Sequence, residues 1–78
     1  MFPHVTEAKH QSGYKVWLKF DVGAEGTVDL EPELSGPVFE PLRKPEEFRR
    51  FKVHPVARTL VWPNGADFAP EYLKSKLS

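Results

Sequence analysis

The best candidates for acid and base chemistry in this sequence are Asp29 and Asp67. A protonated and an ionised carboxyl group in a cleft beside Trp62 would suit a hydrolase-like reaction, in which one group donates a proton and the other accepts one. Short acidic side chains in turn-rich segments more commonly accept backbone N–H groups. We therefore expect both aspartates to cap turns, and we expect no enzymatic activity.

Nucleophilic and metal chemistry have less support. The four serines lie in turns or at the C-terminal end, and none occupies the strand-to-helix elbow that exposes a catalytic serine. A zinc site of three imidazoles would require His4, His10 and His54 to converge, whereas scattered surface histidines are the commoner arrangement. The chain has no cysteine, which excludes thiolate ligands and disulfides. We expect no catalytic residue, no metal and no cofactor.

A cluster of basic residues in the second half of the chain suggests an alternative function, nucleic-acid binding. Its members are Arg43, Lys44, Arg49, Arg50, Lys52 and Arg58. Basic side chains near aromatic rings are typical of surfaces that bind RNA or DNA. Glu46 and Glu47 interrupt the cluster, which favours a solvated helix face. A regulator that binds nucleic acid through Arg43, Lys44, Arg49 and Arg50 is therefore the alternative to the function that we favour.

Aromatic residues near the C-terminus predict a packed corner. Trp62 ends an apolar run, the Pro-Asn-Gly segment 63–65 suits a tight turn, and Pro70 suits the first position of a helix. We expect Trp62, Phe68 and Tyr72 to clamp this helix to the core. The rim of the corner is also a candidate surface for a protein partner, through Trp62, Asn64, Asp67 and Tyr72.

Trp17 is a second candidate for binding a partner. In residues 14–20, Tyr, Val, Leu and Phe alternate with Lys15, Trp17 and Lys19, which is the clearest strand pattern in the chain. Trp17 therefore lies on the polar face between two lysines. Either its ring covers neighbouring side chains, which is the interpretation we favour, or it forms a patch for a partner.

Length and composition limit the class of protein. The chain has 78 residues, which suits one domain over residues 1–78, and a domain of this size buries a small core unless it self-associates. Eleven basic residues balance eleven acidic ones, so no global attraction to nucleic acid or to an anionic membrane is expected. No segment resembles a secretory signal or a membrane span. We expect a cytoplasmic protein.

The pattern of elements predicts an α+β fold. Strands are expected over residues 2–10, 14–20 and 27–30, joined as an antiparallel meander. A helix over residues 45–51 would direct Phe48 and Phe51 to the core, and apolar residues in 38–42 would pack under the sheet. A short strand over 52–54, a strand over 56–62 that lies in the middle of the sheet or is covered by both helices, and a helix from Pro70 complete the order β-β-β-α-β-β-α.

Three runs carry a resemblance to a known family. They are YKVWLKFDVGAEGTVDL, VFEPLRKPEEF and LVWPNGADFAPEYL, and the match extends from about Val5 to Leu73. Together they resemble the small bacterial family known as domain of unknown function 2442. The resemblance implies an α+β fold with a meander sheet and short helices. It also implies a role as the smaller partner in a toxin–antitoxin-like two-gene pair. Some members add a helix-turn-helix, for which this chain is too short.

These observations together favour a non-enzymatic module that binds a small protein partner and regulates or neutralises it. The binding surface would be Trp17, an exposed sheet edge or the turn from Trp62 to Tyr72. A homodimer is the second partner arrangement that we consider. No membrane partner is expected.

Overall fold

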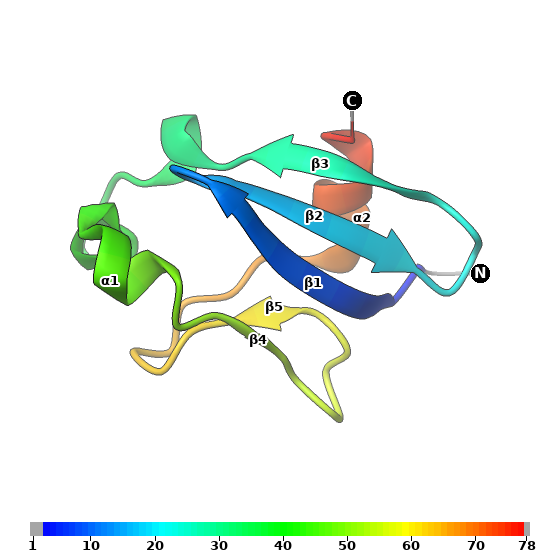
Figure 1. Cartoon of the computed structure of the whole chain (residues 1–78). Coiled ribbons are helices and arrows are strands. Elements are labelled where there is room, and N and C mark those ends of the chain that lie inside the picture. The colour runs from blue at the N-terminus through cyan, green and yellow to red at the C-terminus, as the bar shows by residue number, and fades with distance from the viewer. Residues whose placement is uncertain (1–2, 78) are drawn as a thin grey trace.

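The computed structural model describes residues 3–77, and its N-terminal half is a three-stranded antiparallel meander in the order β1-β2-β3 (Figure 1). The strands are β1 (Val5–Ser12), β2 (Lys15–Phe20) and β3 (Glu25–Asp29). This confirms the predicted meander. β1 begins at Val5 and continues past His10, and residue 2 of the predicted first strand lies outside the described residues.

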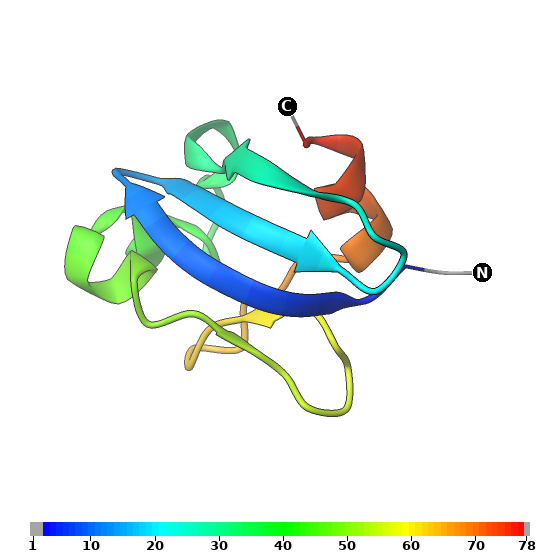
Figure 2. The same ribbon diagram turned by 45° about the vertical axis from the view of Figure 1, so that its right-hand side comes forward.

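The alternation in β2 gives the sheet one buried face and one open face. Val16, Leu18 and Phe20 are buried, whereas Lys15 and Lys19 on the opposite face are exposed. In both views the remaining elements of residues 3–77 lie on the buried side of this sheet (Figure 1, Figure 2). The fold is therefore two-layered, with one sheet face left uncovered by the described chain.

The second half consists of short elements separated by prolines. Two 3₁₀ turns, η1 (Glu31–Glu33) and η2 (Glu40–Arg43), precede α1 (Pro45–Phe48). They are followed by β4 (Lys52–Val53), β5 (Leu60–Val61) and α2 (Pro70–Ser75). α2 begins at Pro70, as predicted, because proline supplies the helical φ and needs no hydrogen-bond acceptor there.

The strand predicted over 56–62 in the middle of one sheet was wrong. β5 covers Leu60–Val61 alone and pairs with β4 in a separate two-stranded sheet. The preceding residues form a loop instead, because the His54 Nδ1 atom accepts the N–H groups of Val56 and Ala57 at 3.1 and 3.0 Å. Arg58 then adopts a left-handed φ of 55°. Local hydrogen bonds thus replace the ladder that a longer strand would need.

The helix predicted over 45–51 ends earlier, and one residue of 38–42 points outward. α1 stops at Phe48, and the N–H of Arg50 turns back to the carbonyl of Glu47. Phe48 is buried and Phe51 is half-buried, with ring centroids 6.2 Å apart. Val38 is 47% exposed, so it does not pack under the sheet as predicted, whereas Leu42 does.

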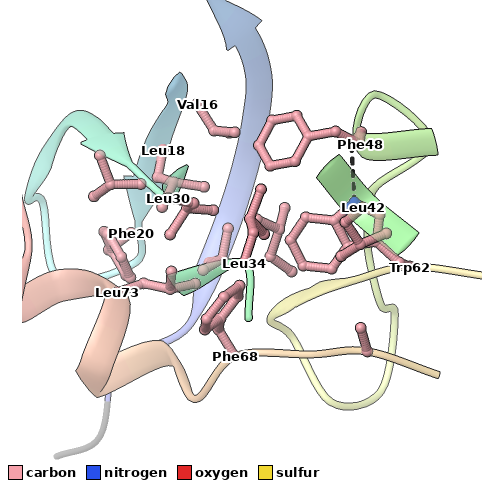
Figure 3. Packing of buried hydrophobic residues seen from close by; sticks show 14 residues of the cluster. Val16, Leu18, Phe20, Leu30, Leu34, Leu42, Phe48, Trp62, Phe68 and Leu73 are labelled. Atoms are coloured by element: carbon pink, nitrogen blue, oxygen red, sulfur yellow. Dashed lines mark hydrogen bonds between the residues drawn. The ribbon is translucent and has the colours of Figure 1, made fainter. Parts of the chain in front are cut away.

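One hydrophobic core joins the two halves (Figure 3). Its buried members come from all three strands of the meander, from η2, α1, β5 and α2, and from the segments beside them. They are Val5, Val16, Leu18, Phe20, Val28, Leu30, Leu34, Leu42, Phe48, Leu60, Trp62, Ala66, Phe68 and Leu73. The core therefore fastens the small second sheet and α2 beneath the meander without extending the meander itself.

Candidate functional site

Trp62 is part of the scaffold. Its side chain is 3% exposed, and its Nε1 donates a hydrogen bond to the Phe48 carbonyl at 2.8 Å (Figure 3). The ring lies 5.9 Å from that of Phe48 and 5.7 Å from that of Phe68, between centroids. A buried tryptophan with its N–H satisfied is a packing anchor. Trp62 therefore belongs to the core clamp and offers its indole to no surface ligand.

The turn after Trp62 is held by Asn64. Its Nδ2 donates to the Val38 carbonyl at 2.9 Å, and its Oδ1 accepts the Ala66 N–H at 3.1 Å. Gly65 has a φ of 91°, which a side chain would strain. The prediction that Asp67 caps this turn was wrong, because Asn64 already does so. Within residues 3–77 the exposed Asp67 carboxylate has no hydrogen bond, and its backbone bridges to Val61.

Asp29 caps a turn as predicted. Its Oδ1 accepts the Glu31 N–H at 3.0 Å, at the start of η1. Asp29 ends β3 and leads into that turn, whereas Asp67 lies between β5 and α2. Trp62, beside which the acid and base pair was considered, is buried.

Tyr72 belongs to a polar cluster that ties α2 to η1. Its hydroxyl donates to Glu33 Oε1 at 2.6 Å, and Lys76 Nζ pairs with Glu33 Oε2 at 2.9 Å. The hydrogen bond from Tyr72 is the main reason that the pKa of Glu33 is lowered, and Lys76 adds to it. Tyr72 and Lys76 each form a side-chain hydrogen bond to Glu33, and this bond raises the pKa of each of them. The cluster stabilises the fold at a surface seam.

This cluster predicts acid sensitivity that Glu33→Gln should reduce. A carboxylate whose pKa is lower in the folded state than its ordinary value of 4.5 stabilises the protein above that pH. This stability is lost as the pH falls through the lowered pKa. The difference in unfolding free energy between the wild type and Glu33→Gln should therefore be largest near neutral pH and shrink in acid, in urea titrations from about pH 7 to about pH 3.

Glu7→Gln is the matched control for this experiment. Glu7 is exposed on β1, and among residues 3–77 it forms no ion pair within 4.0 Å. We expect its variant to follow the wild-type pH profile. Equal profiles for Glu7→Gln and Glu33→Gln would contradict the assignment of acid sensitivity to the Glu33 cluster.

A hollow of mixed polar and apolar lining lies where β1 begins beside the β4–β5 loop. It has a volume of about 360 Å³ and is lined by Val5, Thr6, Asp21, Val53, His54, Pro55 and Arg58. At its edge the two carboxylate oxygens of Asp21 accept the backbone N–H and the Nδ1–H of His4, both at 3.0 Å. These bonds lower the pKa of Asp21, the backbone bond most. The pair fastens the N-terminal segment to the β2–β3 turn.

The three histidines are dispersed. His4 pairs with Asp21, His54 accepts turn amides, and His10 Nε2 lies 2.9 Å from the Gly13 carbonyl. Across residues 3–77, no group of three or more potential His, Cys, Asp or Glu ligands converges on one point. His54 makes local contacts, whereas His4 pairs across 17 residues and the His10 ring lies 6.2 Å from that of Phe48.

Some side chains of the basic cluster have partners within the chain. Arg43 Nε donates to the Leu34 carbonyl at 2.7 Å, and Arg50 lies 3.6 Å from Glu47 in an ion pair. Lys44 and Arg49 are exposed beside α1, while Arg58 lies in the β4–β5 loop next to the Asp21 hollow. Two of the six basic residues, Arg43 and Arg50, therefore have partners within the chain.

Trp17 occupies the open face of the meander. Its ring is half-buried, and the Lys9 ammonium lies 5.6 Å from the ring centroid. In the sheet register Trp17 stands between Lys9 of β1 and Thr27 of β3. The Lys9 ammonium lies over the ring, in line with the favoured interpretation, and the residue is half-buried.

Sequence reasoning missed the partners that come from distant parts of the chain. The Glu33–Tyr72 bond spans 39 residues and the His4–Asp21 bond spans 17. Thr59, a buried polar residue whose hydroxyl donates to the Phe68 carbonyl, was also missed. Only the threonine carried a local signal, since it precedes an apolar run that was predicted to be buried.

The comparisons with known proteins add one match. The family described as "Protein of unknown function (DUF2442)" matches residues 5–77, which is nearly the whole chain. No curated protein and no solved structure matches the chain. Within the described residues, no helix has both the length and the apolar character needed to cross a membrane.

Proposed function

The chain belongs to the DUF2442 family of proteins of unknown function, and from that premise we propose that it is a non-enzymatic protein-interaction module. Its working surface is the open face of the meander around Trp17. The module regulates or neutralises a protein partner, in the manner of the smaller member of a toxin–antitoxin-like pair. Its place of action is the cytoplasm, which suits a chain without cysteine.

The position of Trp17 carries this proposal. The other tryptophan is 3% exposed and serves the core, whereas Trp17 lies on a sheet face that no other described element covers. Tryptophan is enriched among the residues that dominate binding energy at protein interfaces. A half-buried ring flanked by charged side chains supplies such an anchor, because a partner needs to desolvate only its remaining side.

The rim of the Trp62 corner is a less suitable surface. Trp62 is buried, and Asn64 uses its amide to hold the turn. Tyr72 is 38% exposed, but its hydroxyl is committed to Glu33. Asp67 alone presents an uncommitted polar group there among the described residues. We therefore assign the binding role to Trp17.

Nucleic-acid binding is a weaker candidate. Affinity for nucleic acid depends on several cations that contact phosphates together. In this chain Arg43 and Arg50 have internal partners, which leaves Lys44 and Arg49 beside α1. We expect no binding to mixed oligonucleotides that weakens steeply as salt rises.

The test compares Trp17→Ala with Val56→Ala. Both remove an accessible apolar side chain, and Val56 is 82% exposed in the β4–β5 loop, away from the meander face. The tagged wild-type chain is used to isolate its partner from the native host, and the identified partner is then purified. In titration calorimetry with the purified pair, Trp17→Ala should weaken binding by at least about tenfold, while Val56→Ala should leave it unchanged.

The result that would contradict the proposal is equally direct. Unchanged affinity for Trp17→Ala, measured on a variant with wild-type circular dichroism, would remove Trp17 from the binding surface. Salt-sensitive binding to oligonucleotides that is lost in Arg49→Glu would replace the proposal with the nucleic-acid function.

A further inference from the structure

The open face of the meander carries an ordered pattern of charge. Its β2 column is Lys15, Trp17 and Lys19, and the sheet register sets these residues opposite Asp29, Thr27 and Glu25 of β3. The β2 column is therefore basic at both ends, and the β3 column is acidic at both ends. Each row of the face pairs a basic or aromatic residue with an acidic or polar one.

Three of the four charged side chains in these two columns remain available, and the fourth, Asp29, accepts the Glu31 N–H through Oδ1. Lys15, Lys19 and Glu25 are exposed, and none of them takes part in an ion pair within 4.0 Å among residues 3–77. The cross-strand neighbours thus stand opposite one another without closing into salt bridges. A second surface with the inverse charge pattern would find them free to pair.

We propose that, when no other protein occupies this face, it binds a second copy of the chain, related by a two-fold axis that runs parallel to the strands between β2 and β3. This inference rests on the proposed function, which makes the same face an interface. Rotation about this axis keeps each residue at the same level along the strands. It places the β2 column of one copy over the β3 column of the other. Lys19 of one copy then faces Glu25 of the other, Lys15 faces Asp29, and Trp17 covers Thr27.

The charge pattern opposes two other two-fold pairings, and a third, centred between β1 and β2 so that Lys19 faces Glu7, is distinguished by the Glu7→Lys control below. An axis centred on β2 places Lys15 over Lys15 and Lys19 over Lys19. An axis perpendicular to the strands through the Trp17 row places Lys15 over Lys19 and Glu25 over Asp29. Both bring like charges together, which opposes association. The axis between β2 and β3 makes both charged rows of these two columns attractive.

The geometry of stacked sheets accommodates these contacts. Face-to-face sheets pack about 10 Å apart and cross at about 30°. An extended lysine and a carboxylate together span such a gap, and the flexible lysine stem absorbs the displacement that the crossing produces at the outer rows. Three strands offer a small contact area, so the dimer belongs to the weak, concentration-dependent class of interface.

The test is a charge exchange between two variants. In a pair of identical copies, Lys19→Glu sets an acidic side chain at position 19 against Glu25, and Glu25→Lys sets a basic side chain at position 25 against Lys19. Each variant alone should be monomeric in sedimentation equilibrium from about 10 to about 500 µM, a range in which the wild type dimerises.

An equimolar mixture of the two variants should dimerise again. Across the axis, the acidic side chain introduced at position 19 of one copy meets the basic side chain introduced at position 25 of the other. The native Glu25 of the first copy meets the native Lys19 of the second. Both altered rows are then attractive, so the mixed dimer regains the complementarity that each variant lacks with itself.

Glu7→Lys is the matched control. Glu7 is exposed on β1 and stands opposite Lys19 on the other side from Glu25. Glu7→Lys alone should dimerise as the wild type does, because Glu7 lies outside the two facing columns. It should not draw Lys19→Glu into mixed dimers, and rescue of Lys19→Glu by Glu7→Lys in place of Glu25→Lys would overturn the proposed axis. Thermal unfolding of each variant shows whether it is folded, and the rescue by mixing depends on association alone.

Failure of this inference is distinguishable from failure of the proposed function. A wild-type chain that stays monomeric to about 500 µM would overturn self-pairing. If Trp17→Ala still weakens binding to a different purified protein, the proposed function stands. If the chain dimerises but neither charge variant alters the dimer, self-pairing occurs elsewhere and the inference is wrong.

Discussion

Trp62→Ala is expected to remove a large part of the chain's free energy of unfolding. Large-to-small substitutions of a buried aromatic residue cost about 3 to 5 kcal/mol. At typical stabilities per residue, a domain of this length has about 4 to 12 kcal/mol in total. Trp62 is 3% exposed and contacts three other aromatic rings, so the cavity would lie at the centre of the core.

Urea unfolding followed by far-ultraviolet circular dichroism measures this effect. Trp17→Ala is the matched control, because it removes the same side chain from the open sheet face. We expect it to cost less than about 1 kcal/mol, as surface substitutions usually do. Trp62→Phe keeps a ring but leaves the Phe48 carbonyl without its donor, and it should fall between the two. Equal stability of the two alanine variants would refute the scaffold role of Trp62.

Thr59→Val is expected to have the second-largest effect. Thr59 is 4% exposed, and its hydroxyl donates to the Phe68 carbonyl in the segment that leads to α2. Valine matches threonine in shape but offers no donor, so the carbonyl would remain buried without this bond. Leaving a buried polar group unsatisfied costs about 1 to 3 kcal/mol.

Thr6→Val is the control for this prediction. The Thr6 hydroxyl also donates to a backbone carbonyl, that of Lys19 at 3.2 Å, but at an exposed site where water can replace it. The free energy of unfolding should change by less than about 0.5 kcal/mol in this variant. A similar loss in both variants would show that burial at Thr59 does not set the cost.

The parts of the fold that were predicted well depend on local physics. The alternation in β2 separates a core face from a solvent face wherever the strand is placed, and proline at position 70 favours a helix start in any context. Asp29 needed only the N–H two residues ahead to become a cap. In each case the interacting groups lie within one element or one turn.

The parts that were predicted wrongly depend on competition between alternatives. The apolar run around Leu60 indicated burial, but periodicity cannot say whether a sheet or a packed loop provides it. The His54 Nδ1 atom accepts the N–H groups of Val56 and Ala57, which a longer strand would have used in its ladder. Asp67 and Asn64 were both suitable caps for the same turn, and the position of the Ala66 N–H decided for Asn64.

The candidate binding face likewise has one part that local sequence determines and one part that the tertiary structure determines. The sequence by itself determined that Trp17 shares a strand face with Lys15 and Lys19, because side chains alternate along a strand. Only the tertiary structure decided that this face stays open and that Asp29 and Glu25 stand beside those lysines. Strand register and the placement of the second layer arise from contacts between distant residues, which no local pattern encodes.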